Sequence, residues 1–125
     1  MHRSTLGVVV VDIDEPDHDE GLAFWATALG AKAIQVKEHV EYHSISGPGV
    51  PMGFLVQRIS GPSRVHLDIW TDDLEAEVGR LEAAGAERVE LIDFWQVMRD
   101  PAGMLFCVIP APEGRLDDTN SITWP

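Results

Sequence analysis

The sequence has a single cysteine, Cys107, among its 125 residues. No internal disulfide can form, which excludes a small disulfide-stapled fold. Basic residues are also scarce, because 9 Lys and Arg stand against 21 Asp and Glu and give a formal net charge of −12. A field of that sign repels nucleic-acid phosphates and anionic membrane surfaces. We therefore expect no nucleic acid and no membrane among the partners.

Long hydrophobic runs are missing too. The apolar run near the start, residues 6–11, is ended by Asp12. It is too short for the core of a signal peptide and far too short for the roughly 20 residues that span a bilayer. The expected location is therefore the cytoplasm. The sequence also contains no P-loop, no Gly-rich nucleotide fingerprint and no Ser-His-Asp order.

What the sequence does contain is an internal repeat. Residues 6–59 and 64–109 each run a strand-like apolar segment, an amphipathic helix, a glycine and three more strand-like segments. A repeat of this kind indicates one supersecondary unit used twice. We predict a single domain, residues 1–125, with a loose tail at 110–125. Its fold class is α+β: two tandem βαβββ modules forming a curved, eight-stranded mixed sheet or half-barrel cup with the helices outside.

The second helix has the clearer sequence signals. It is predicted over residues 73–84, with Leu74, Val78 and Leu81 on its buried face and Thr71 or Asp72 as its cap. The first helix is predicted to start at residue 17 and to stop at residue 30. Apolar alternation at residues 65, 67 and 69 supports the packing of both modules as one sheet. The predicted strands are 8–13, 33–36, 41–45, 52–59, 64–70, 87–92, 94–99 and 104–109.

Four stretches carry a resemblance to a known family: GLAFWATALGAK, FLVQRI, RVHLDIWTDDLEAEVGRLEAAGAERV and WQVMRDPAGMLFCV. With them the chain resembles the glyoxalase/bleomycin-resistance/dioxygenase group, the vicinal oxygen chelate superfamily, and in particular its short glyoxalase-like domains. The resemblance covers nearly the whole chain up to residue 110. It implies paired modules around a small-molecule cup. It also implies a homodimer, because such modules leave sheet edges that need covering.

The resemblance also implies where a metal would bind. In metal-dependent members, the first and last strands of each module give one ligand each, and these positions are Val8, Gln57, His66 and Cys107 here. Val8 cannot bind a metal, and a set without a carboxylate suits Mg, Mn or Fe poorly. A His/Cys/Gln set could hold Zn. We therefore expect no metal cofactor, with a divalent metal held by His66, Gln57 and Cys107 as the alternative.

Each candidate catalytic residue has a second interpretation. His66 shares one strand face with Asp68, which could orient its imidazole or simply be solvated. Cys107 is either a small buried hydrophobe or a thiolate with His66 as its base. Gln57 is either a satisfied core amide or a group that orients a ligand.

Aromatic residues on the strands are the candidate ligand-binding wall. Phe54, Trp70 and Trp95 are assigned to it because their strands would form the cup. The remaining histidines are expected to be exposed: His2, His18, His39 and His43.

Two functions follow from these residues. The first is a homodimeric binding protein that holds a small apolar or aromatic ligand without metal. The alternative is a lyase, isomerase or dioxygenase-type enzyme, with His66 as base or metal ligand, Gln57 as polariser and Cys107 in the place of a carboxylate. The missing metal donors favour the first. A fold resemblance by itself names no substrate.

Overall fold

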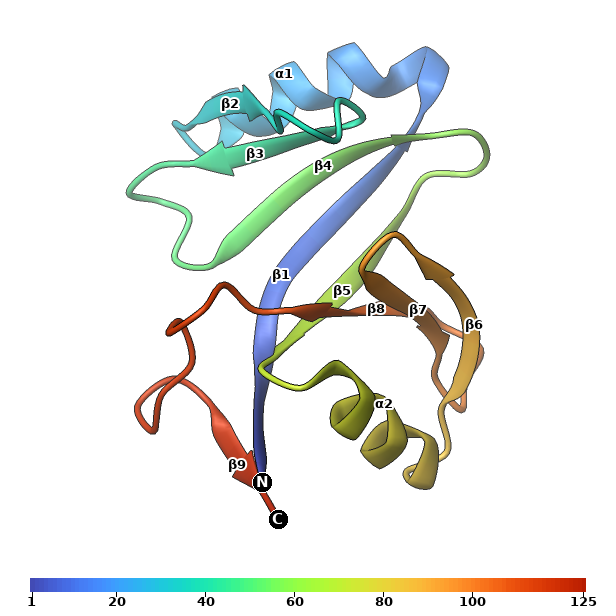
Figure 1. Ribbon diagram of the computed structural model, residues 1–125. Coiled ribbons are helices and arrows are strands. Elements are labelled where there is room, and N and C mark those ends of the chain that lie inside the picture. Colours follow the sequence, from blue (N-terminus) through green and yellow to red (C-terminus); the bar gives the residue numbers. More distant parts are fainter. The chain divides into compact units, whose positions relative to one another are not determined.

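The computed structural model describes residues 1–125 and has an α+β fold with one mixed nine-stranded sheet (Figure 1). The helices are the 3₁₀ turn η1 (Glu15–Asp17), α1 (His18–Ala28) and α2 (Leu74–Ala83). The strands are β1 (His2–Asp14), β2 (Lys32–Gln35), β3 (Tyr42–Ser46), β4 (Gly53–Ile59), β5 (Arg64–Thr71), β6 (Glu87–Ile92), β7 (Trp95–Arg99), β8 (Leu105–Pro110) and β9 (Ile122–Trp124). No helix is long and apolar enough to cross a membrane.

The chain divides into two compact units. The first unit is residues 8–66, and the second is residues 1–7 together with residues 67–125. The divisions fall within β1 and β5, whereas the sequence repeat places its boundary at the 61–63 linker. The eight strands predicted from the repeat are all present, and β9 is additional.

The first unit has the strand order β2-β3-β4-β1. Strands β1 and β4 run parallel, and β3 runs antiparallel to both β4 and β2. Its core consists of Ile13, Ile45 and Val56, and side chains of α1 such as Trp25 pack against it. Because side chains alternate along a strand, α1 covers one face of this sheet, and the residues between the core positions lie on the other.

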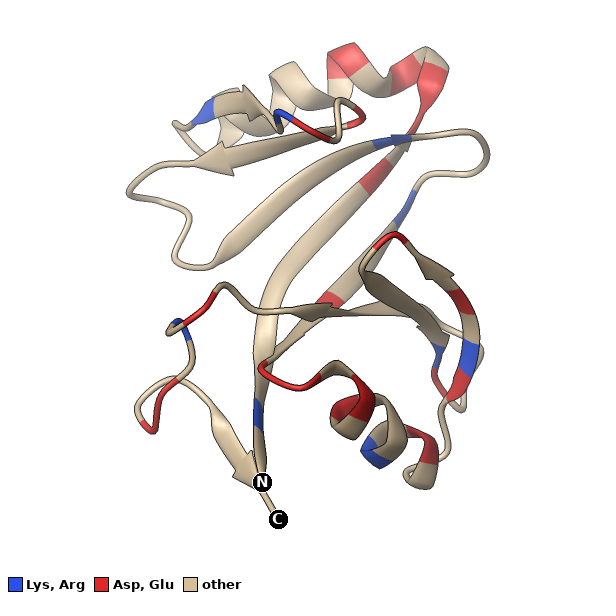
Figure 2. Ribbon diagram, in the orientation of Figure 1, with Lys and Arg blue, Asp and Glu red and all other residues tan.

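The second unit has the strand order β5-β8-β7-β6, and α2 covers one face. Val78, Met98 and Val108 form its core, with Leu74 and Leu81 packed against them. The predicted buried face of this helix is therefore confirmed. Figure 2 shows the acidic residues that accompany the first turns of both helices, where the helix dipole favours negative charge.

The cap of α2 differs from the prediction. Asp73 is the N-cap, and its side chain accepts a hydrogen bond from the backbone N–H of Ala76. Thr71 is fully buried and uses its hydroxyl to donate to the Arg3 carbonyl at 2.8 Å. Three candidate caps in a row, Thr-Asp-Asp, leave the first helical residue ambiguous in the sequence.

The tail at 110–125 is also more ordered than predicted. Strand β9 pairs antiparallel with the start of β1, placing Trp124 opposite His2. The Trp124 indole Nε1 donates to Ser4 Oγ at 2.8 Å, and the Arg80 guanidinium lies 3.8 Å above the indole ring. A three-residue strand is too short to show a hydrophobic period, so β9 could not be predicted from the pattern of the tail.

Candidate functional site

The face of the first unit turned away from α1 carries the candidate polar group. Val11 and Val56 belong to the α1 side, so their neighbours Asp12 and Gln57 lie on the opposite side. Asp12 and Gln57 are directly paired across β1 and β4. Gln57 also pairs with Tyr42 of β3. The predicted site residue Gln57 therefore lies beside a carboxylate in the sheet.

Asp12 and His66 form a buried pair. The His66 Nδ1 lies 2.6 Å from Asp12 Oδ2, and Arg64 Nε donates to the same oxygen at 3.2 Å. Asp12 is fully buried and His66 is 8% exposed. The carboxylate accepts the Nδ1 proton, which fixes the tautomer and leaves Nε2 as the basic nitrogen. Such an imidazole is suited to exchange a proton with a ligand or to bind a metal.

A buried carboxylate needs hydrogen bonds to both of its oxygens, and only one oxygen of Asp12 has them. Its Oδ2 receives the contacts from His66 and Arg64, whereas its Oδ1 is buried without a hydrogen-bond partner. Leaving such an acceptor unsatisfied costs about 1–3 kcal/mol. Groups of this kind concentrate at functional sites, because selection for folding alone would remove them.

The second unit contributes its own polar pair. Asp68 of β5 is paired with Cys107 of β8, and both are nearly buried, at 3% and 9% exposure. The adjacent Val108 faces α2, so Cys107 and Asp68 face the other way. Trp70, two residues beyond Asp68, shares this face. Trp95 shares it too, because it lies two residues before Val97, which is paired with Cys107.

The Trp70 indole is held by a close contact. A Cβ on Gly7 would lie 2.5 Å from the indole ring, so only glycine fits at that position. The Arg115 guanidinium lies 5.2 Å from the centroid of the same ring. The sequence placed Trp70 on this strand but gave no sign of either contact.

His66, Asp68 and Cys107 form a group of potential metal ligands. One ligand atom from each lies within 4.8 Å of the others. Imidazole, carboxylate and thiolate donors together suit Zn²⁺, which binds three protein ligands and keeps a fourth position open in catalytic sites. Since Asp12 occupies Nδ1, a metal would be bound through Nε2 of His66. The residues therefore fit a divalent metal better than the sequence indicated, because Asp68 supplies the carboxylate.

Phe54 does not belong with these residues. It lies three positions before Gln57 on β4 and packs into the core beneath α1, with its ring centroid 5.9 Å from that of Trp25. Its assignment to the ligand-binding wall is therefore corrected: an odd spacing along a strand places two side chains on opposite faces.

Asp12 is the residue that sequence reasoning missed. In the sequence it appears only as the residue that ends an apolar run. The available signal was a carboxylate inside a strand of β-branched residues, at an alternating position that a buried face would occupy. On β5 the buried and exposed side chains alternate: His66 and Asp68 are buried, whereas Val65 and Leu67 are 49% and 43% exposed.

Two histidines expected to be exposed are buried. His2 is 6% exposed and His18 is 1% exposed. His2 Nε2 lies 2.6 Å from the fully buried Glu77 Oε2, which also accepts from Arg80 Nε at 2.9 Å. Burial by itself raises the pKa of the Glu77 carboxyl, but hydrogen bonds from Arg80, His2 and Ser4 outweigh burial and lower the pKa. This network ties α2 to the start of β1.

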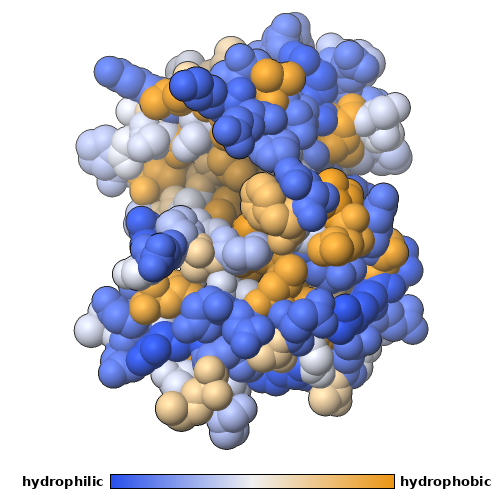
Figure 3. Space-filling model, in the orientation of Figure 1, coloured by the Kyte–Doolittle hydropathy of each residue, from blue (hydrophilic) through white to orange (hydrophobic).

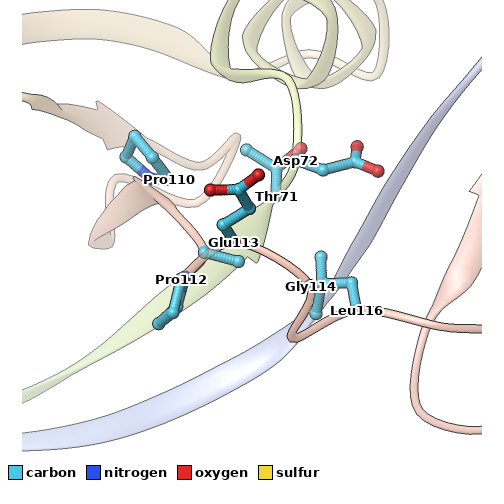
Figure 4. A pocket seen from close by; sticks show the side chains of 8 residues that line it. Thr71, Asp72, Pro110, Pro112, Glu113, Gly114 and Leu116 are labelled. Carbon is cyan, nitrogen blue, oxygen red and sulfur yellow. The ribbon is translucent and has the colours of Figure 1, made fainter.

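A cavity of about 310 Å³ lies in the second unit beside the tail (Figure 4). Its walls come from the end of β5, the end of β8 and the segment that follows it. They include two carboxylates, Asp72 and Glu113, and the apolar Leu116. None of the predicted site residues lines it.

Comparison with protein families gives one match. The family model described as the glyoxalase-like domain matches residues 8–109. Comparison with the curated proteins finds no match.

Solved structures of similar fold include three enzymes. Methylmalonyl-CoA epimerase from Mycobacterium tuberculosis has a TM-score of 0.62 at 15% identity, over 86% of this chain and 89% of that one. The Mn(II)-bound glyoxalase from Novosphingobium aromaticivorans has a TM-score of 0.61 at 20% identity, over 88% of this chain and 40% of that one. The 2,2′,3-trihydroxybiphenyl 1,2-dioxygenase from Sphingomonas wittichii has a TM-score of 0.59 at 17% identity, over 93% of this chain and 43% of that one. At these identities the likeness concerns the fold.

Proposed function

Since the chain belongs to the glyoxalase-like domain family, we propose that it binds a small, largely apolar or aromatic molecule at His66. The observation that carries the proposal is the Asp12–His66 hydrogen bond of 2.6 Å between two buried side chains. An imidazole held in one tautomer offers a ligand one basic nitrogen of defined direction. In the first unit Gln57 lies beside Asp12 and adds an amide that can donate or accept.

Within the second unit, we propose that Trp70 and Trp95 offer an aromatic surface to an apolar molecule. Trp70 and Trp95 lie on the strand face that also carries Cys107. Tryptophan offers a broad apolar surface for an aromatic ring. A net charge of −12 disfavours a strongly anionic ligand, so a neutral molecule fits the chain better.

The test is a binding isotherm with neutral aromatic probes. Nile red and a panel of phenols are titrated into the protein, with tryptophan fluorescence as the readout. The proposal predicts saturable binding that weakens at least tenfold in His66→Ala. His39→Ala is the matched control, since His39 is a partly exposed histidine paired with Glu41 at 3.8 Å. Binding that is equal in all three proteins would contradict the proposal.

A second candidate function is a metal-dependent lyase, isomerase or dioxygenase. The specific observation in its favour is the group of His66, Asp68 and Cys107, with ligand atoms within 4.8 Å. A divalent ion bound there would act as a Lewis acid on a ligand oxygen. Asp12 would orient His66, and Gln57 would polarise the ligand. Elemental analysis of untagged protein tests this: about one metal per chain, lost in His66→Ala, supports it, and metal-free protein contradicts it.

We also propose that two copies of the chain associate as a homodimer. Strands β2 and β6 are edge strands, and every residue in each is exposed. Large apolar side chains also reach the surface among hydrophilic ones (Figure 3). Open edges and apolar patches of this kind are usually covered by a partner. Analytical ultracentrifugation at tens of micromolar protein is expected to give the mass of two chains, and a single-chain mass would contradict this.

A further inference from the structure

Two histidines come together on the helix side of the first unit. His18 is the first residue of α1, and His43 lies on β3 opposite Val56, a core residue beneath that helix. Their ring centroids are 5.5 Å apart, with the ring planes tilted by 45°. This is the face of the sheet opposite to the one that carries Asp12 and Gln57. The pair is therefore separate from the proposed small-molecule site.

Both rings have a buried nitrogen without a hydrogen-bond partner. For His18, which is 1% exposed, this atom is Nε2, and for His43 it is Nδ1. Burying an imidazole nitrogen without a partner is costly, and such atoms in folded proteins usually have a water or an ion nearby. On these two neighbouring rings, the protein therefore leaves one nitrogen each without a hydrogen bond.

The other nitrogen of His18 is already engaged. Its Nδ1 lies 3.0 Å from Asp19 Oδ1 and 3.2 Å from Arg58 Nη2, and this Nη2 also donates to Asp19 Oδ1 at 3.3 Å. In the tautomer in which Nδ1 donates to the Asp19 carboxylate, the lone pair lies on Nε2, as it does in histidines that bind metals. Asp19 and Glu20 bring negative charge to the first turn of α1 (Figure 2), and the Arg58 guanidinium beside His18 offsets part of it.

The spacing of the rings matches a shared ion. Two imidazoles bound to one ion at about 2.1 Å in a tetrahedral arrangement place their ring centroids roughly 5 Å apart. We propose that His18 and His43 form a two-histidine site for a transition-metal ion of the Zn²⁺ or Ni²⁺ class. Imidazole is a preferred ligand of these ions, and water completes the coordination.

Calorimetric titration with Zn²⁺ tests the site. His18→Ala and His43→Ala should each lose one Zn²⁺ equivalent or bind it at least tenfold more weakly. His39→Ala, a histidine near β3 outside the pair, should keep it. His66→Ala should keep it too, which separates this site from the group with Asp68 and Cys107. Loss in His66→Ala alone, or equal binding in every variant, would overturn the proposal.

A second measurement needs no substitution, because removal of a buried histidine can unfold the chain. In ¹⁵N-labelled wild-type protein, Zn²⁺ should shift the imidazole signals of two histidines, with the His18 Nε2 signal changing most. Unchanged His18 and His43 signals at saturating Zn²⁺ would overturn the metal site.

Discussion

At the residue scale, the proposed site depends on one buried polar pair. Asp12 and His66 are both buried, and they hold each other at 2.6 Å. The sequence predicted His66 and Cys107 as site residues, because each occupies a family position on a strand. It could not predict Asp12 as the partner of His66, because that contact joins two strands 54 residues apart and depends on their register.

Asp12→Asn is expected to weaken both stability and ligand binding. An amide can still occupy the space, but it replaces a charge-assisted hydrogen bond to His66 with a neutral one and frees the imidazole to change tautomer. We expect a loss of about 1–3 kcal/mol in the free energy of unfolding in urea. Asp118→Asn is the control: it removes an exposed ion pair with Arg3 and should leave stability unchanged. An Asp12 variant as stable as this control would contradict the assigned role.

The Glu77 carboxyl is expected to make the free energy of unfolding fall at acidic pH. Its pKa is lowered in the folded chain, so its contribution is fully present above the unfolded value of 4.5 and is lost as the pH falls through the lower folded value. Urea unfolding between pH 3 and 7 should show a steeper loss below pH 4.5 in the wild type than in Glu77→Gln. Parallel curves for the two proteins would show that the network with His2 and Arg80 does not shift this carboxyl.

At the element scale, the repeat predicted the helices and eight strands correctly, because hydrophobic periods are local. The start of α2 and the strand β9 escaped prediction for a different reason. Three consecutive capping residues compete at positions 71–73, and the choice of Asp73 follows from Thr71 binding the Arg3 carbonyl. Strand β9 is held by a contact between the two ends of the chain, because the Trp124 indole donates a hydrogen bond to Ser4.

Gly7→Ala tests how tightly β1 and β5 pack in the second unit. The added methyl group would lie 2.5 Å from the Trp70 ring, so the indole or the strand must move. We expect a loss of about 1–3 kcal/mol in the free energy of unfolding and a change in tryptophan fluorescence. Gly79→Ala in α2 has open space around it and should stabilise the chain by about 0.5–1 kcal/mol. Equal effects of the two substitutions would count against the packing described.

At the scale of the whole molecule, the acidic charge and the family match restrict the kind of ligand and the fold. The charge of −12 disfavours a strongly anionic ligand, and the glyoxalase-like fold of this chain is shared with several enzymes. A shared fold names no ligand, so we expect the specificity to come from this chain's own side chains, and we propose His66 for that role.

The most direct test of the account follows the His66 imidazole by NMR while a neutral aromatic ligand binds. In ¹⁵N-labelled protein we expect His66 to show a protonated Nδ1 and an unprotonated Nε2, because Asp12 accepts the Nδ1 proton. Addition of a bound phenol or Nile red should shift the Nε2 signal of His66 and leave that of His39 unchanged. A ligand that binds the protein without changing the His66 signal would contradict the central claim.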